Sequence, residues 1–84
     1  MWRNGGTGRK ELVHNGIYRH YKGNLYRVVC VARNTEDGSL DELVVYQSLY
    51  GDYGFWARPK KMFLETVVVD GVETERFSLY CKPA

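Results

Sequence analysis

Residues 16–34, which read G-I-Y-R-H-Y-K-G-N-L-Y-R-V-V-C-V-A-R-N, constrain the fold more than any other stretch of the chain. Apolar and polar side chains alternate on both sides of the tripeptide Lys22-Gly23-Asn24. This pattern is typical of two half-buried strands joined by a tight turn, so it predicts a β-hairpin. The middle of residues 25–34 is apolar on both faces, and we therefore expect the second strand of the hairpin to be central in a sheet.

Two further strands are predicted after this hairpin. A polar loop over residues 34–41 leads into an apolar run over residues 42–49, which indicates a third strand antiparallel to the second. A turn over residues 50–54, rich in glycine and tyrosine, then precedes a short aromatic strand over residues 55–58.

Residues 59–63, P-K-K-M-F, have room for a single helical turn, with Pro59 at the first helical position that proline favours. We expect Met62 and Phe63 to close one end of the core from this turn. Further on, Asp70-Gly71 separates a β-branched run from an alternating run, and this dipeptide predicts a tight hairpin with a type I′ turn. A last strand is expected to end near Tyr80.

Five or six short antiparallel strands, one helical turn near residues 59–63 and no long helix predict an all-β domain. A small, partly open SH3-like barrel fits best, because that class places a one-turn helix just before its closing strand. An OB-like barrel is the second choice. It usually has a longer helix between its third and fourth strands, and no long helix is predicted here. The predicted barrel covers residues 14–80, with a short tail over residues 81–84.

Residues 1–13 are expected to form a flexible arm, because they are rich in glycine and show no hydrophobic periodicity. A phosphate-binding loop is the alternative for the run Gly5-Gly6-Thr7-Gly8. Such a loop needs a strand before it and a helix after it, and neither is predicted here.

The composition bounds the possible functions. At 84 residues the chain has room for one core, and a formal net charge of +2 is too small to indicate nucleic-acid binding by itself. Cys30 and Cys81 lie outside any Cys/His spacing typical of metal sites, so no metal and no cofactor are expected. With no signal peptide and no transmembrane segment predicted, we expect a cytoplasmic protein with reduced thiols, although a Cys30–Cys81 disulfide stays open.

The motifs have a particular order along the chain. Residues 16–23 read G-I-Y-R-H-Y-K-G, residues 43–47 read L-V-V-Y-Q, residues 56–59 read W-A-R-P, Met62 and Phe63 follow, and Arg76-Phe77 comes last. This order resembles one family of small bacterial domains of unknown function. The resemblance covers most of the chain and implies no activity.

Twelve aromatic side chains exceed what the interior of so small a barrel can hold, so several are expected at the surface. Aromatic rings beside arginines can stack on nucleic-acid bases or hold an extended peptide. The candidate binding residues share an expected position on the strands or their ends: Tyr18, His20, Tyr21, Tyr46, Trp56, Arg58 and Arg76. For Trp56, a role as the main core side chain is an equally open interpretation.

Two functional hypotheses follow. The first is a non-catalytic binding module for nucleic acid, RNA rather than duplex DNA, or for a peptide of a protein partner. The second is a small enzyme or anion-binding protein that uses His20 with Arg58 or Arg76. No nucleophile–base spacing points to catalysis, so the first hypothesis is favoured, and the oligomeric state stays open.

Overall fold

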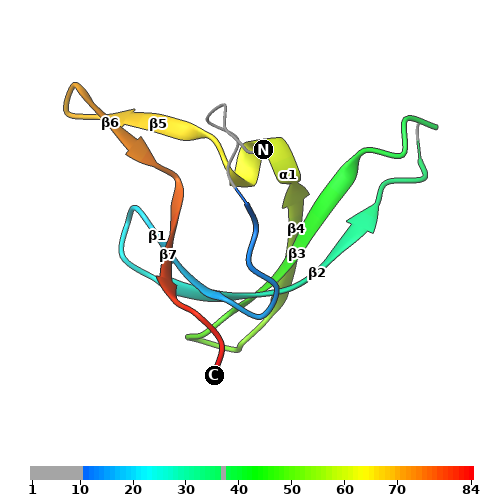
Figure 1. The fold of residues 1–84 in the computed structure, drawn as a ribbon, viewed down its shortest axis with the longest axis horizontal. Coiled ribbons are helices and arrows are strands. Elements are labelled where there is room, and N and C mark those ends of the chain that lie inside the picture. Colours follow the sequence, from blue (N-terminus) through cyan, green and yellow to red (C-terminus); the bar gives the residue numbers. More distant parts are fainter. Residues whose placement is uncertain (1–10, 37) are drawn as a thin grey trace, which may run out of the picture.

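The computed structural model describes residues 11–36 and 38–84, which form two antiparallel β-sheets and one short helix (Figure 1). The elements follow one another as β1 (Ile17–His20), β2 (Leu25–Arg33), β3 (Glu42–Ser48), β4 (Phe55–Pro59), α1 (Lys60–Phe63), β5 (Thr66–Val69), β6 (Val72–Glu75) and β7 (Phe77–Cys81). The all-β prediction with a single helical turn is therefore confirmed.

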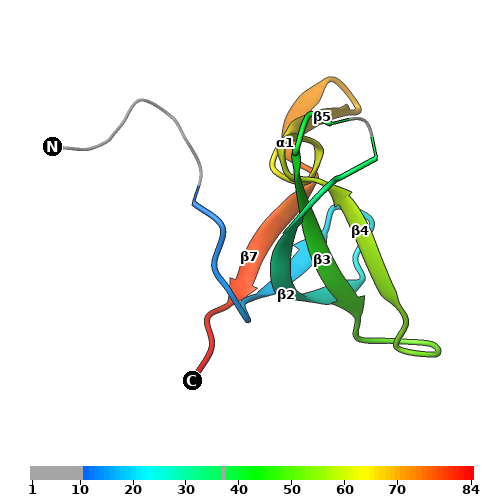
Figure 2. The ribbon, with the colours of Figure 1, turned by 90° about the vertical axis from the view of Figure 1, so that its right-hand side faces the viewer.

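Five strands form the larger sheet in the order β4-β3-β2-β1-β7, and β5 pairs with β6 alone in the smaller one. The larger sheet curves strongly, so that β7 and β4 stand on opposite sides of its concave face (Figure 2). Within the described residues β4 and β7 do not pair with each other, so the sheet is not closed into a barrel.

The hairpin predicted over residues 16–34 is present as β1 and β2. Tyr18 pairs with Tyr26, and the turn between the strands places Gly23 at a φ of 114°, where a side chain would be strained. As predicted, β2 is a central strand, flanked by β1 and β3. A β-bulge between Val28 and Cys30 shifts the register of β2 against β3, which bends the strand.

The core is built largely from aromatic rings. Phe63 and Phe77 stack with their centroids 4.0 Å apart, and the rings of Tyr18 and Tyr46 pack against Phe63 at 5.4 and 5.3 Å. The fully buried core consists of Tyr18, Val28, Val44, Tyr46, Phe63 and Phe77. Trp56 is 54% exposed, so the interpretation of Trp56 as the main core side chain is wrong.

The helical turn begins one residue later than predicted. Pro59 is the last residue of β4 and precedes the helix with a ψ of 135°, outside the helical range. Phe63 closes the core with no exposed surface, as expected, whereas Met62 is 40% exposed. A helix of four residues turns only one of these two adjacent side chains toward the core, because neighbours in a helix point about 100° apart.

The hairpin predicted at Asp70-Gly71 is present as β5 and β6. Val69 pairs with Val72, and the two residues between them have φ angles of 51° and 79°, as a type I′ turn requires. The chain then bends at Arg76, whose N–H donates to the carbonyl of Glu65 at 3.1 Å. This bend separates β6 from β7, which is why the structure has seven strands rather than five or six.

Two residues of the predicted arm over residues 1–13 contact the core. Leu12 and Val13 pack against the core, and the N–H of Val13 donates to the hydroxyl of Tyr18 at 2.9 Å. Residues 1–10 lie outside the described part. Cys30 and Cys81 are exposed free thiols, and no helix formed by residues 11–36 or 38–84 is long and apolar enough to cross a membrane.

Candidate functional site

The inner face of the sheet carries both residues predicted to share a face of β4. Trp56 lies opposite Tyr46 in the pairing of β3 and β4, and Arg58 lies opposite Val44. Cross-strand partners point to the same side of a sheet. Since Tyr46 and Val44 belong to the core, Trp56 and Arg58 point to the core side of the sheet, but from its edge strand.

Arg58 is held in place by the core. Its Nε donates to the hydroxyl of Tyr46 at 3.3 Å, while the Tyr46 ring is only 5% exposed. No carboxylate pairs with Arg58 in the part of the chain that the structure describes. The guanidinium group therefore combines a fixed position with a positive charge that no ion pair neutralises.

A hydrogen bond from its ring nitrogen fixes the indole of Trp56. Its Nε1 donates to Oγ of Ser48 at 3.4 Å, and this hydroxyl donates to the carbonyl of Gly54 at 3.2 Å. Ser48 is itself buried. The hydrogen bonds orient an aromatic side chain that is more than half exposed, which is the condition for stacking on a planar ligand.

His20 packs between aromatic rings at the end of β1. Its ring stacks on Tyr21 with centroids 4.5 Å apart and meets the ring of Phe77 edge-on at 4.9 Å. Nδ1 accepts the backbone N–H of Lys22 at 3.1 Å, so the neutral ring carries its proton on Nε2. The imidazole can then offer a donor at Nε2, but no free acceptor nitrogen.

Burial lowers the pKa of His20 from 6.5, and the positive charges of Arg58, Arg76 and Lys22 lower it further. The effect of the two arginines shows that the fold brings them within electrostatic range of His20. His20, Arg58 and Arg76 lie far apart in the sequence. From the sequence, their grouping in an anion-binding site is only a hypothesis.

Arg76 differs from Arg58 because the guanidinium group of Arg76 is paired with a carboxylate. Its Nη2 forms an ion pair with Oε1 of Glu65 at 2.7 Å, and its side chain is only 20% exposed. Nε is buried and has no hydrogen-bond partner among the described residues. Arg76 thus adds positive charge near His20 but offers a ligand little of its guanidinium group.

Two tyrosines that the sequence did not single out extend this surface. The hydroxyls of Tyr26 and Tyr50 lie 2.9 Å apart, and the Tyr26 ring contacts those of His20 and Tyr46 at 6.4 and 5.5 Å. Burial and the hydrogen bond to Tyr50 raise the pKa of Tyr26 to about 12. Tyr26 alternates in register with the core residue Val28, and this was the only sequence signal for its inward position.

We call His20, Tyr26, Tyr50, Trp56 and Arg58 the aromatic–arginine face. Of the predicted binding residues, Tyr18 and Tyr46 are core residues whose rings are not available for stacking. Tyr18 uses its hydroxyl to hold Val13, and Tyr46 uses its own to hold Arg58. Tyr21 supports His20, with the amine of Lys22 lying 5.9 Å from the centroid of its ring.

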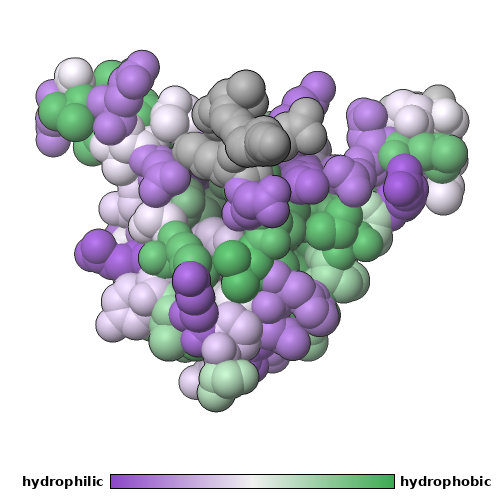
Figure 3. All heavy atoms as spheres, in the orientation of Figure 1, coloured by the Kyte–Doolittle hydropathy of each residue, from purple (hydrophilic) through white to green (hydrophobic). Residues whose placement is uncertain are grey.

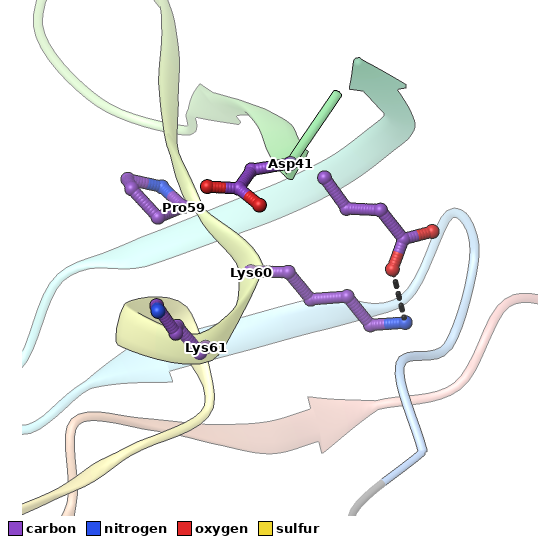
Figure 4. Close-up of a pocket in the computed structure, with 5 residues that line it drawn as sticks. Asp41, Pro59, Lys60 and Lys61 are labelled. Atoms are coloured by element: carbon purple, nitrogen blue, oxygen red, sulfur yellow. Dashed lines mark hydrogen bonds and ion pairs between the residues drawn. The ribbon is translucent and has the colours of Figure 1, made fainter. Parts of the chain in front are cut away.

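A separate pocket of about 290 Å³ lies at the start of the helix, lined by Asp41, Glu42, Pro59, Lys60 and Lys61 (Figure 4). Lys60 extends to Glu42, and the two side chains form an ion pair of 3.4 Å. This pocket is lined by charges of both signs and by no aromatic ring. We therefore consider it a weaker candidate for a binding site than the aromatic–arginine face. In the described residues no group of His, Cys, Asp and Glu side chains is arranged to hold a metal ion.

The fold and this face define a small antiparallel β domain whose open inner side carries Arg58, which has no carboxylate partner in the described residues, among aromatic rings. The chain belongs to the DUF1653 family of proteins of unknown function, whose family model matches residues 16–79. It is similar to a protein of this family from Bordetella bronchiseptica with a known crystal structure. That protein shares 32% sequence identity over 83% of this chain and 90% of its own, with a TM-score of 0.70. No curated protein matches the chain.

Proposed function

We propose that the protein is a non-catalytic binding module whose aromatic–arginine face binds single-stranded nucleic acid, RNA rather than duplex DNA. One observation carries the proposal: Arg58, which has no carboxylate partner in the described residues, lies on the same face of β4 as the half-exposed Trp56. An arginine beside an exposed indole combines phosphate binding with base stacking.

Each group of the face has a role in this proposal. A base stacks on the Trp56 indole, and the neighbouring phosphate accepts charge-assisted hydrogen bonds from Arg58. His20 donates from Nε2 without adding a charge, since its pKa is lowered. The hydroxyls of Tyr26 and Tyr50 are neutral groups suited to the 2′-hydroxyl, which distinguishes RNA from DNA.

An unpaired strand suits this face better than a duplex. Stacking on Trp56 needs an exposed base face, and paired bases in a duplex hide theirs. Affinity for duplex DNA also comes mainly from many phosphate contacts, whereas the chain has a net charge of +2 and the face contains one guanidinium group, that of Arg58.

The geometry supports the alternative, a small enzyme or anion-binding protein using His20 with Arg58 or Arg76, less well. A general base needs a free nitrogen lone pair, and Nδ1 of His20 already accepts the Lys22 N–H. With Arg76, an anion would have to displace Glu65, and with either arginine His20 adds no positive charge to the clamp, because its pKa is lowered.

We further propose that the larger sheet is an SH3-like barrel left open between β4 and β7. The strand order β4-β3-β2-β1-β7 and the helical turn between β4 and the last strand support this description. The β5–β6 hairpin is then an insertion between the helical turn and that last strand.

The test is a titration of a single-stranded RNA oligonucleotide, followed by fluorescence anisotropy at two salt concentrations. We expect Arg58→Ala to weaken binding about tenfold, the cost of losing hydrogen bonds to a charged group. Arg19→Ala is the matched control, because Arg19 is exposed and alternates with the inward-pointing Tyr18 and His20. It removes the same charge from the outer face and should leave the affinity within about twofold.

Absence of RNA binding at low salt would contradict the proposal, and so would an equal loss for both variants. Phosphate binding weakens steeply as salt rises. A ligand held by stacking alone would show almost no salt dependence, and in that case a peptide of a protein partner would replace RNA as the ligand.

A further inference from the structure

The β5–β6 hairpin is separate from the five-stranded sheet. Its two strands pair only with each other, and the turn that joins them points away from α1 and β4 (Figure 1). A hairpin of two strands is at best marginally stable in water by itself. The exposed side chains of this hairpin are therefore available for contact with another surface.

Apolar side chains are exposed at the end of the hairpin. Val72 is 62% exposed beside the turn, and Val68 is 71% exposed on the opposite face. The register places Val72 with Val69 on one face and Val68 with Glu73 on the other. In the space-filling view, hydrophobic residues crowd this end of the molecule between hydrophilic ones, at the upper left (Figure 3).

The hairpin is also the acidic part of a basic chain. Residues 65–75 include Glu65, Asp70, Glu73 and Glu75, whereas all 12 lysines and arginines lie outside this segment. Glu65 is paired with Arg76. Asp70 and Glu73, which flank Val72 and the turn, form no ion pair within residues 11–36 and 38–84.

The aromatic–arginine face has the complementary properties. Arg58 is a cation without a carboxylate partner in the described chain, and the exposed Trp56 beside it is an apolar surface. On one face of the hairpin, the exposed Val68 lies beside Glu73, a carboxylate without a cation partner in the described chain. The two surfaces belong to different sheets of one molecule, so a second copy of the chain is the occupant that the charges favour.

We propose that the end of the β5–β6 hairpin, formed by Val68, Asp70 and Glu73, docks on the aromatic–arginine face of a second copy. When each copy gives its hairpin to the other, the contact closes into a two-fold dimer with two identical interfaces. Glu73 faces Arg58 in this contact, and Val68, on the same face of the hairpin as Glu73, packs near Trp56. The hairpin also competes with RNA for the face, and only this last statement rests on the proposed function.

The test is sedimentation velocity on the full chain at about 0.05 M and about 0.5 M salt, since screening weakens contacts between charged surfaces. We expect a species of about twice 9.8 kDa at low salt, and the monomer at high salt. Glu73→Arg and Arg58→Glu should each be monomeric at low salt, because each places like charges across both interfaces.

An equimolar mixture of these two variants tests whether residues 73 and 58 face each other across the interface. In the mixed dimer, the arginine introduced into one hairpin meets the glutamate introduced into the other face, and the second interface is unchanged. We therefore expect the mixture to restore the dimer. Glu36→Arg, at an exposed residue of the loop between β2 and β3, makes the same charge change elsewhere and should leave the dimer intact.

The proposal is overturned by a monomeric wild-type chain at low salt, or by variants that do not recombine. RNA titrations distinguish these failures from a failure of the proposed function. Glu73→Arg should bind RNA at least as tightly as the wild type, because its hairpin no longer competes. RNA binding by a chain that never dimerises would remove the docking proposal alone, and a dimer that never binds RNA would remove the nucleic-acid proposal alone.

Discussion

The five-stranded sheet and the β5–β6 hairpin have similar sequences but different kinds of stability. Both contain runs of β-branched and aromatic residues bounded by residues that favour turns. In the sheet these residues meet across a core, where Phe63 has no exposed surface and Phe77 has 4%, whereas Val68 and Val72 in the hairpin are 71% and 62% exposed. The alternating pattern therefore specifies strands, while their burial depends on what the topology places opposite them.

The two regions therefore depend on different residues. The sheet rests on stacked aromatic rings contributed by α1, β1, β3 and β7. The hairpin rests on its turn, where Asp70 and Gly71 both have positive φ. Substitutions in the first set should affect the whole domain, and substitutions in the second should affect the hairpin alone.

Phe63→Ala should have the largest effect. Truncating a fully buried phenylalanine lowers the free energy of unfolding by about 3–5 kcal/mol, because burial is lost and a cavity is left. Chemical denaturation followed by circular dichroism measures this loss. Val68→Ala is the control, and at an exposed position its change should stay within about 0.5 kcal/mol. Similar losses for both variants would remove the distinction between the two regions.

Gly71→Val should have a smaller, local effect. Gly71 has a φ of 79°, and a β-branched residue held there costs about 1–3 kcal/mol. Hydrogen exchange should show faster exchange of the β5 and β6 amides and unchanged protection of β2 and β3. Gly71→Asn is the control, since asparagine tolerates positive φ. Equal acceleration in both sheets would show that the hairpin supports the larger sheet.

Acidification should have the smallest effect, and it acts on the sheet through His20. The folded pKa of His20 lies below 6.5, so the unfolded chain takes up this proton first as the pH falls through 6.5, and the folded state loses stability. The melting temperature of His20→Gln should therefore fall less than that of the wild type between about pH 7.5 and about pH 5.5. A His20→Gln slope equal to that of the wild type would contradict this explanation.

Much of the fold could be predicted from the sequence because its signals are local. Alternation defined β1 to β4, and Asp70-Gly71 defined a turn of the right type, since positive φ at both positions favours these residues. The end of β6 could not be predicted in the same way. It depends on the hydrogen bond from Arg76 to the distant Glu65.

The site was harder to predict, because exposure and pairing are properties of the tertiary structure. Periodicity placed Trp56 and Arg58 on one face but did not show that β4 is an edge strand, where Trp56 stays exposed. The ion pair between Arg76 and Glu65 and the hydrogen bond between Tyr26 and Tyr50 join residues that are distant in the sequence. No spacing within one element indicates such contacts.

The fluorescence of Trp56, read in a variant that carries Trp2→Phe, tests whether this indole is an exposed surface on which a base stacks. We expect an emission maximum typical of an exposed indole, which single-stranded RNA quenches at low salt as a base stacks on the ring. Arg58→Ala should keep the emission maximum of the free protein and lose most of the quenching at the same RNA concentration. A blue-shifted emission that RNA does not change would show that Trp56 is a buried core residue, and the proposed binding face would be wrong.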